Sequence, residues 1–264
     1  MVHDDSIKHM AAVLGKTVMD QMVAFKAGEA LLELNKPCAA DLEANRVDPP
    51  PVEGVLALRG MLKDPNAEFL FVAQALALDM LQRPLRSGII ILRTGGGKSF
   101  LYLLASWWLA QGGLGGRFIA VIVPFKELMN DISARCASYG LIPDRFEHGA
   151  DASVEGMLVR TKSPLVLISA DKFVNSSRVD DFLRTAKSRN RLHCVVMDEA
   201  QAIIDPFRHN LSFLPAKLEK LDVPLILNSG SITPSEEITL RRIFSKHFIL
   251  ILIPSSDYLQ PLVI

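Results

Sequence analysis

Ser87–Leu104 reads SGIIILRTGGGKSFLYLL, an apolar run, a glycine-rich turn and a second apolar run. Within it, Gly88–Leu92 is short and apolar, which is typical of a parallel strand buried on both faces. Phe100–Leu109 predicts an apolar helix. A glycine-rich turn between strand and helix lets backbone N–H groups point at an anion, next to the positive end of the helix. The order of these parts therefore predicts a phosphate-binding loop.

The turn also carries the side chains that a magnesium-bound triphosphate needs. Lys98 would reach the β- and γ-phosphates, and the Ser99 hydroxyl would hold Mg²⁺. The full pattern asks for a glycine five places before Gly97, where this chain has Leu92. The alternative is an ordinary glycine-rich turn, and the strand before and the helix after it favour the phosphate loop. The predicted cradle consists of Thr94, Gly95, Gly96, Gly97, Lys98 and Ser99.

Composition limits the function classes. The chain has 264 residues, of which 49% are hydrophobic, so it can bury a sizeable core. Its 29 basic and 29 acidic residues predict no strong general attraction to nucleic acid, so any DNA contact would be local. Cys38, Cys136 and Cys194 lie far apart, which favours free thiols in a reducing compartment. Met1–Met10 is polar, and the longest apolar runs are too short for a bilayer, so we expect a soluble intracellular protein without a membrane partner.

Residues 1–66 form a predicted helical N-terminal region. Ile7–Leu34 has apolar residues at helical spacing and predicts one or two helices. Asp48–Pro51 is a stiff proline-rich break, and Val55–Leu62 predicts another short helix. This region shows no catalytic pattern, and its methionines indicate a packing surface.

Helices and strands alternate across residues 67–253. Strands that recur with helices between them favour a mostly parallel sheet covered on both faces, hence an α/β domain. The predicted strands are 88–92, 117–123, 165–169, 192–197, 223–228 and 248–253, and the predicted helices are 68–81, 100–109, 126–139, 179–187 and 234–244.

Acidic residues follow one of the buried strands directly. Ligands of such sheets bind beyond the carboxyl ends of the strands, where Asp198 and Glu199 are expected. Asp198 would hold the metal ion, and Glu199 would orient or deprotonate the attacking water. A solvated acidic turn is the alternative. A further polar cluster, Asn228–Ser231, follows the next strand.

Together these motifs resemble the first motor domain of superfamily 2 helicases, most closely that of the RecQ group. The TGGGKS loop of that group is matched by Thr94–Ser99, and its Asp-Glu-Ala-His box by Asp198–Gln201. Its SPLISLMQDQ motif is matched loosely by Val123–Asp131, and its TAT motif is matched by Ser229–Ser231. The resemblance covers about residues 67–264. It implies a RecA-like P-loop fold, ATP and Mg²⁺ as cofactors, single-stranded DNA or a duplex junction as partner, 3'-5' helicase activity and a nuclear location.

The resemblance also assigns roles to single residues. Gln74 would select adenine, because an amide can pair with both N6 and N7 of that base. Gln201 replaces the usual His and would act with Lys98 and Glu199 in catalysis, although an amide cannot carry a proton. It could still bridge the acidic box to the coupling loop, which consists of Ser229, Gly230 and Ser231. DNA contacts, or merely solvated surface residues, would be Lys126, Ser169, Lys172, Phe207 and Arg208.

Two departures from the RecQ pattern bear on activity. The loop after the acidic box is shorter than in that group and lacks Trp, and only Phe207–Arg208 resembles its aromatic-rich loop. A working helicase has a second motor domain that supplies catalytic arginines, whereas residues 254–264 resemble only the linker into it. We therefore expect a truncated motor domain that needs a second domain or a protein partner to unwind DNA. The alternatives are a non-catalytic binding or interaction module and an unrelated phosphate-loop kinase or GTPase, against which the motif order argues.

Overall fold

The computed structural model describes residues 52–93, 95–112, 116–146, 153–205, 207–244 and 247–252. The predicted helices over 7–34, the proline-rich break, Thr94 and the tail 254–264 lie outside these ranges. Among the helices within them, none combines the length and apolar character that a membrane crossing requires.

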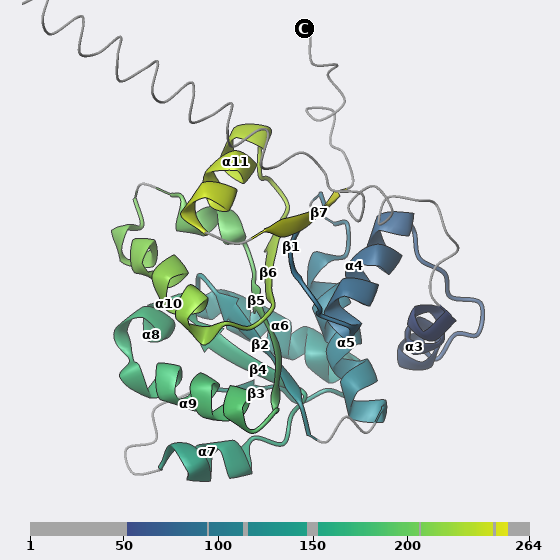
Figure 1. Cartoon of the computed structure of the whole chain (residues 1–264). Helices are drawn as coiled ribbons and strands as arrows, with labels where there is room; N and C mark the ends of the chain where they lie inside the picture. The colour runs from purple at the N-terminus through teal and green to yellow at the C-terminus, as the bar shows by residue number, and fades with distance from the viewer. Residues whose placement is uncertain are drawn as a thin grey trace, which may run out of the picture. The chain divides into compact units, whose positions relative to one another are not determined.

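Within the described ranges, seven strands form one sheet in which every neighbouring pair is parallel (Figure 1). Their order across the sheet is β3-β4-β2-β5-β6-β1-β7. This arrangement confirms the predicted α/β class and its parallel sheet. The strands are β1 (Ser87–Ile91), β2 (Phe118–Val123), β3 (Asp144–Arg145), β4 (Leu165–Ser169), β5 (Leu192–Met197), β6 (Leu225–Ser229) and β7 (Phe248–Leu252).

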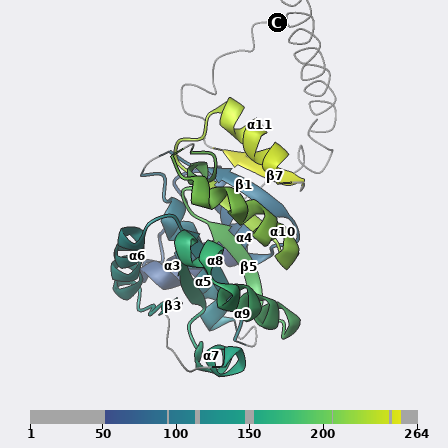
Figure 2. The same cartoon turned by 90° about the vertical axis from the view of Figure 1, so that its left-hand side faces the viewer.

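Helices cover both faces of the sheet (Figures 1 and 2). One face packs against α3 (Val52–Leu62), α4 (Val72–Gln82), α5 (Lys98–Gln111) and α6 (Lys126–Ser138). The other packs against α7 (Val154–Arg160), α8 (Ala170–Asn175), α9 (Ser177–Ser188), α10 (Leu214–Leu221) and α11 (Pro234–Ile243). Two short 3₁₀ helices, η1 (Ala200–Ile203) and η2 (His209–Phe213), follow β5. The helices α7, α8 and α10 were not predicted, because segments of six to eight residues show too little of the helical period.

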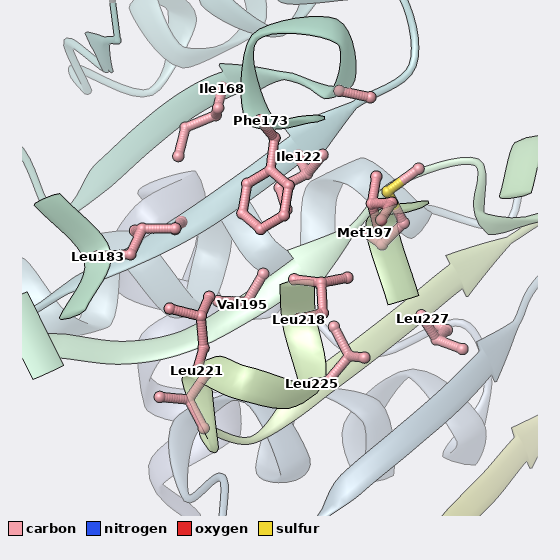
Figure 3. Close-up of a cluster of buried hydrophobic side chains, with 14 of the residues drawn as sticks. Ile122, Ile168, Phe173, Leu183, Val195, Met197, Leu218, Leu221, Leu225 and Leu227 are labelled. Carbon is pink, nitrogen blue, oxygen red and sulfur yellow. The ribbon is translucent and has the colours of Figure 1, made fainter. Parts of the chain in front are cut away.

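The side chains of the strands contribute to two separate apolar layers, because successive residues of a strand point to opposite faces of the sheet. In β1, Ile89 and Ile91 join one layer, whereas Ile90 joins the other. Figure 3 shows part of the first layer, where Phe173 of α8 lies among side chains from β2, β4 and β5. Burial on both faces explains why the central strands are predominantly apolar rather than alternating.

The start of α4 differs from the prediction in a way that bears on the phosphate loop. The sequence predicted a helix from Glu68, but α4 begins at Val72. Phe71 is extended, and the Gln74 side-chain oxygen accepts the N–H of Leu70 at 2.9 Å. The side chain of Gln74 therefore holds the backbone that enters the helix.

Helix α3 shares the core of the α/β region. Its residues Ala57, Leu58 and Met61 are buried in the layer that also contains α4 and α5. A Cβ atom at Gly60 would lie 2.7 Å from the Trp107 ring of α5, so only glycine permits this close approach. The predicted domain boundary at residue 66 stays a prediction.

Candidate nucleotide site

The strand order brings three motifs to one edge of the sheet. The phosphate loop follows β1, the coupling loop follows β6, and the acidic box follows β5. These strands are neighbours in the order β5-β6-β1, although β1 and β5 are far apart in the sequence. The crossover that places β6 between them cannot be read from the sequence, and it determines which loops touch.

The phosphate loop has the backbone geometry of an anion cradle. Gly95 and Gly97 have φ values of 79° and 85°, which non-glycine residues rarely adopt. Gly97 is the N-cap of α5 and offers no side chain to the first N–H groups of that helix. These N–H groups, at the positive end of a helix of 14 residues, are oriented for a phosphate.

Gln74 packs directly against this loop. Its Nε2 donates to the carbonyl of Gly96 at 2.9 Å, and its Oε1 accepts the backbone N–H of Leu70. The side chain is buried, and a Cβ atom at Gly97 would lie 3.0 Å from Nε2. Gln74 therefore supports the shape of the cradle, and its predicted selection of adenine stays a prediction.

The side chain of Lys98 extends from the phosphate loop to the coupling loop. A Cβ atom at Gly230 would lie 2.5 Å from Lys98 Nζ, so the missing side chain of Gly230 makes room for the ammonium group. The TAT motif of the RecQ group has alanine at this position. The glycine of this chain thus permits a contact between the lysine and the loop after β6.

Asp198 is the most enclosed carboxylate of the acidic box, with only 1% of its surface exposed. Its Oδ2 accepts the hydroxyl of Tyr102 at 3.0 Å. Its Oδ1 accepts the side-chain amide of Asn228 and the N–H of Glu199, each at 3.1 Å. Sequence reasoning placed Asn228 in a polar cluster but missed its contact with Asp198, and it missed the role of Tyr102 in the helix after the phosphate loop.

Burial dominates the titration of this carboxyl group. It raises the pKa of Asp198 to about 6, and the charge of Glu199 adds to the rise. The hydrogen bond from Tyr102 and the charge of Lys98 act in the opposite direction. Burial also raises the pKa of Tyr102 well above its ordinary value, so its hydroxyl stays a donor to Asp198 at neutral pH.

Replacing Asp198 by Asn should stabilise the nucleotide-free protein at neutral pH. A carboxyl group whose pKa is higher in the folded than in the unfolded state stabilises the fold fully only below its unfolded pKa. For Asp198 this stabilisation is lost as the pH rises through its folded pKa of about 6. We expect Asp198→Asn to add on the order of 2 kcal/mol to the free energy of unfolding near pH 7.5, and much less near pH 4. Urea unfolding at both pH values checks this.

The surface variant Asp79→Asn, which breaks an i,i+4 ion pair with Arg83, serves as the control. It should change stability by less than about 1 kcal/mol. An Asp198→Asn protein that is destabilised at neutral pH would contradict the cost assigned to the buried charge.

Glu199 and Gln201 connect the acidic box to the coupling loop. Glu199 has a left-handed backbone, with φ 49° and ψ 54°, which turns the chain sharply after Asp198. Gln201 donates from Nε2 to Glu199 Oε2 at 2.7 Å, and its Oε1 accepts the hydroxyl of Ser229. The N–H of Ser231 in turn donates to Ser229 Oγ at 3.3 Å. The hydrogen-bonded bridge expected from the sequence is therefore present, and its role in coupling stays a prediction.

A cavity of about 460 Å³ opens beside the phosphate loop. It is lined by Lys98, Ser99 and Glu199 together with Asp131 and Arg135 of α6. The contribution of α6 was not predicted, because its charged residues resemble an ordinary solvated face. The cavity provides space for phosphate groups between an ammonium group and a carboxylate.

The residues at this edge suit Mg²⁺. Asp198, the Ser99 hydroxyl and phosphate oxygens are hard oxygen ligands, which this ion prefers. Asn228 Oδ1 is buried without a hydrogen-bond partner among the described residues, in the same amide that donates to Asp198. Those residues contain no group of three His, Cys, Asp or Glu side chains that could hold a metal by themselves. The chemistry thus fits an ion held by one carboxylate together with a phosphorylated ligand.

Three of the predicted DNA contacts gather at one place. Lys126, Ser169 and Lys172 line a second cavity, of about 300 Å³, together with Arg145. Lys172 Nζ donates to the Phe146 carbonyl at 3.1 Å, and the buried Ser169 side chain caps α8. Sequence reasoning missed Arg145 because the two-residue strand β3 that carries it gives no pattern.

The other two predicted contacts lie in the loop after the acidic box. The Arg208 guanidinium stacks over the ring of Phe125, 3.9 Å from its centroid, and is also paired with Asp205 at 3.2 Å. Phe125 directly precedes Lys126, so this loop touches the segment that lines the second cavity. Phe207 is 92% exposed.

The sequence and the fold of this chain are similar to those of known helicases. A sequence profile of DEAD/DEAH box helicases matches residues 72–238, more than half of the chain. Two solved structures have a similar fold. DUF1998 helicase MrfA bound to DNA is 15% identical, with a TM-score of 0.55 over 78% of this chain and 28% of that chain. The same helicase bound to DNA and AMPPNP is 16% identical, with a TM-score of 0.55 over 80% and 30%. This chain therefore spans less than a third of that helicase, and no curated protein sequence matches it.

Proposed function

The chain belongs to the DEAD/DEAH box helicase family, and we propose that it is the ATP-binding and DNA-binding motor domain of an ATP-dependent helicase. The observation that carries this proposal is the meeting of the phosphate loop, the coupling loop and the acidic box on three adjacent strands. This meeting supports the proposal that one nucleotide acts on all three. The RecQ-like type, the 3'-5' polarity and the nuclear location rest only on the sequence resemblance.

The proposed division of labour follows from the chemistry of each group. The backbone N–H groups around Gly97 and the Lys98 ammonium bind the β- and γ-phosphates. Ser99 and Asp198 would hold Mg²⁺, which neutralises phosphate charge when bound. Glu199 takes a proton from the attacking water, because its carboxylate lines the same cavity as Lys98.

The hydrogen-bonded bridge gives this site a path to DNA. Gln201 links Glu199 to Ser229, and the same post-β5 segment reaches Phe125 through Arg208. Loss of the γ-phosphate would disturb the contacts of Glu199 first. We propose that this change passes along the segment to the cavity of Lys126.

DNA binding at the second cavity is tested by neutralising Lys126, an exposed residue at the start of α6. We expect Lys126→Ala to weaken binding of single-stranded DNA and to reduce the slope of log affinity against log salt by about 1, because one phosphate contact is lost. Fluorescence anisotropy at several salt concentrations measures both quantities.

Lys187→Ala is the matched control. This lysine is paired with Asp222 and lies in the last turn of α9, before β5 begins at the opposite edge of the sheet. The Lys187→Ala variant loses the same charge as Lys126→Ala but should leave the slope of log affinity against log salt unchanged. Equal slopes for Lys126→Ala and the parent chain would place the DNA elsewhere.

A further inference from the structure

Asn228 is a buried polar residue that follows three apolar residues in its strand. It follows Leu225, Ile226 and Leu227 in β6 and is 2% exposed. Across the sheet it pairs with Ile90 of β1. A buried amide in such surroundings costs free energy unless its donors and acceptor find partners, so its presence calls for a compensating contact.

Only half of this amide is satisfied by the described residues. Nδ2 donates to Asp198 Oδ1 at 3.1 Å, whereas Oδ1 has no partner among them. A leucine would avoid the cost of the unpaired oxygen. The orphan acceptor belongs to the same planar amide that touches Asp198, so it lies close to the carboxylate assigned to the metal ion.

Tyr102 approaches the same carboxylate from another side. Its hydroxyl donates to Asp198 Oδ2 at 3.0 Å, and its side chain is 1% exposed. It stands one helical turn after Ser99, the second residue assigned to the metal ion. The two donors from α5 and β6 therefore fix both oxygens of one carboxylate.

We propose that Asn228 and Tyr102 are positioning residues for Mg²⁺, and that Asn228 Oδ1 accepts a hydrogen bond from a water molecule bound to that ion. This inference rests on the proposed nucleotide site. Mg²⁺ usually keeps several waters, which are strong donors, and a buried acceptor beside its carboxylate ligand satisfies one of them. The pairing removes the cost of the orphan oxygen only when the ion is present.

The test measures how nucleotide binding depends on Mg²⁺. A fluorescent ATP analogue is bound to the parent chain and to variants, first with a chelator and then at rising Mg²⁺ concentration. We expect Asn228→Leu to raise the half-saturating Mg²⁺ concentration about 10–100-fold, the usual effect of losing an outer hydrogen-bond partner of a metal site. For Asn228→Leu, binding in the chelator should stay unchanged, because the Asn228 side chain donates to Asp198 and not to the phosphate loop.

Ser106→Ala is the matched control, and Tyr102→Phe is the second variant. Ser106 has a buried hydroxyl on α5 that donates to the Tyr102 carbonyl and not to Asp198, so its loss should leave the Mg²⁺ dependence unchanged. Tyr102→Phe should also raise the half-saturating Mg²⁺ concentration. If Asn228→Leu does not fold, the result for Tyr102→Phe tests the inference. Half-saturating Mg²⁺ concentrations equal to that of Ser106→Ala would overturn the inference. Failure of the parent chain to bind nucleotide would instead overturn the proposed function.

Discussion

A Glu199→Gln variant should bind ATP as tightly as the parent chain and hydrolyse it about 10²–10⁴-fold more slowly. Glutamine keeps an oxygen that can accept the hydrogen bond from Gln201, so the bridge to Ser229 survives the change. The neutral amide cannot accept a proton from water. The loss therefore falls on the chemical step and not on binding. Single-turnover hydrolysis with excess protein, with and without single-stranded DNA, measures it.

Glu53→Gln provides the control, since this exposed residue of α3 lies in the first turn of a helix outside the site. It should leave turnover unchanged. Equal turnover in Glu199→Gln and the parent chain would remove Glu199 from the reaction. No DNA-stimulated turnover in the parent chain, together with intact nucleotide binding, would favour the non-catalytic module.

A Lys98→Ala variant should lose about 10–100-fold in ATP affinity. Lys98 brings the positive side chain of the cradle, and a charged hydrogen bond contributes about 1.5–3 kcal/mol. The methyl group of alanine also leaves the space beside Gly230 empty. Isothermal titration with ATP and Mg²⁺ gives the affinity directly.

Lys220→Ala, which removes an exposed lysine in the last turn of α10, is the charge-matched control. Its affinity for ATP should equal that of the parent chain. Unchanged affinity in Lys98→Ala would mean that the phosphates bind elsewhere. An equally large loss of ATP affinity in Lys220→Ala would indicate a general effect of charge and not a phosphate site at Lys98.

The elements that position the site were largely predictable from the sequence. Residues 165–169 and 192–197 are predominantly apolar, with Ser169 and His193 as the polar exceptions, and β4 and β5 have these same bounds. Continuous burial leaves a strong pattern. Gly95 and Gly97 likewise indicate positive backbone φ angles, which other residues rarely adopt.

Contacts between the motifs were not predictable in the same way. The order of β5, β6 and β1 depends on long crossovers, and it alone brings Asn228 to Asp198 and Gly230 to Lys98. Tyr102 resembled another apolar helix residue until its hydroxyl was seen to meet Asp198. Buried polar pairs of this kind have no periodic signature in a single sequence.

The most direct test of the nucleotide site is a crystal structure of this chain grown with Mg²⁺ and AMPPNP. We predict that the β- and γ-phosphates lie on the backbone N–H groups of residues 95–99, with Lys98 Nζ moved from Gly230 toward them. The ion should lie between Ser99 and Asp198. A nucleotide bound away from this loop, or an ion without Asp198 in its surroundings, would contradict the assignment.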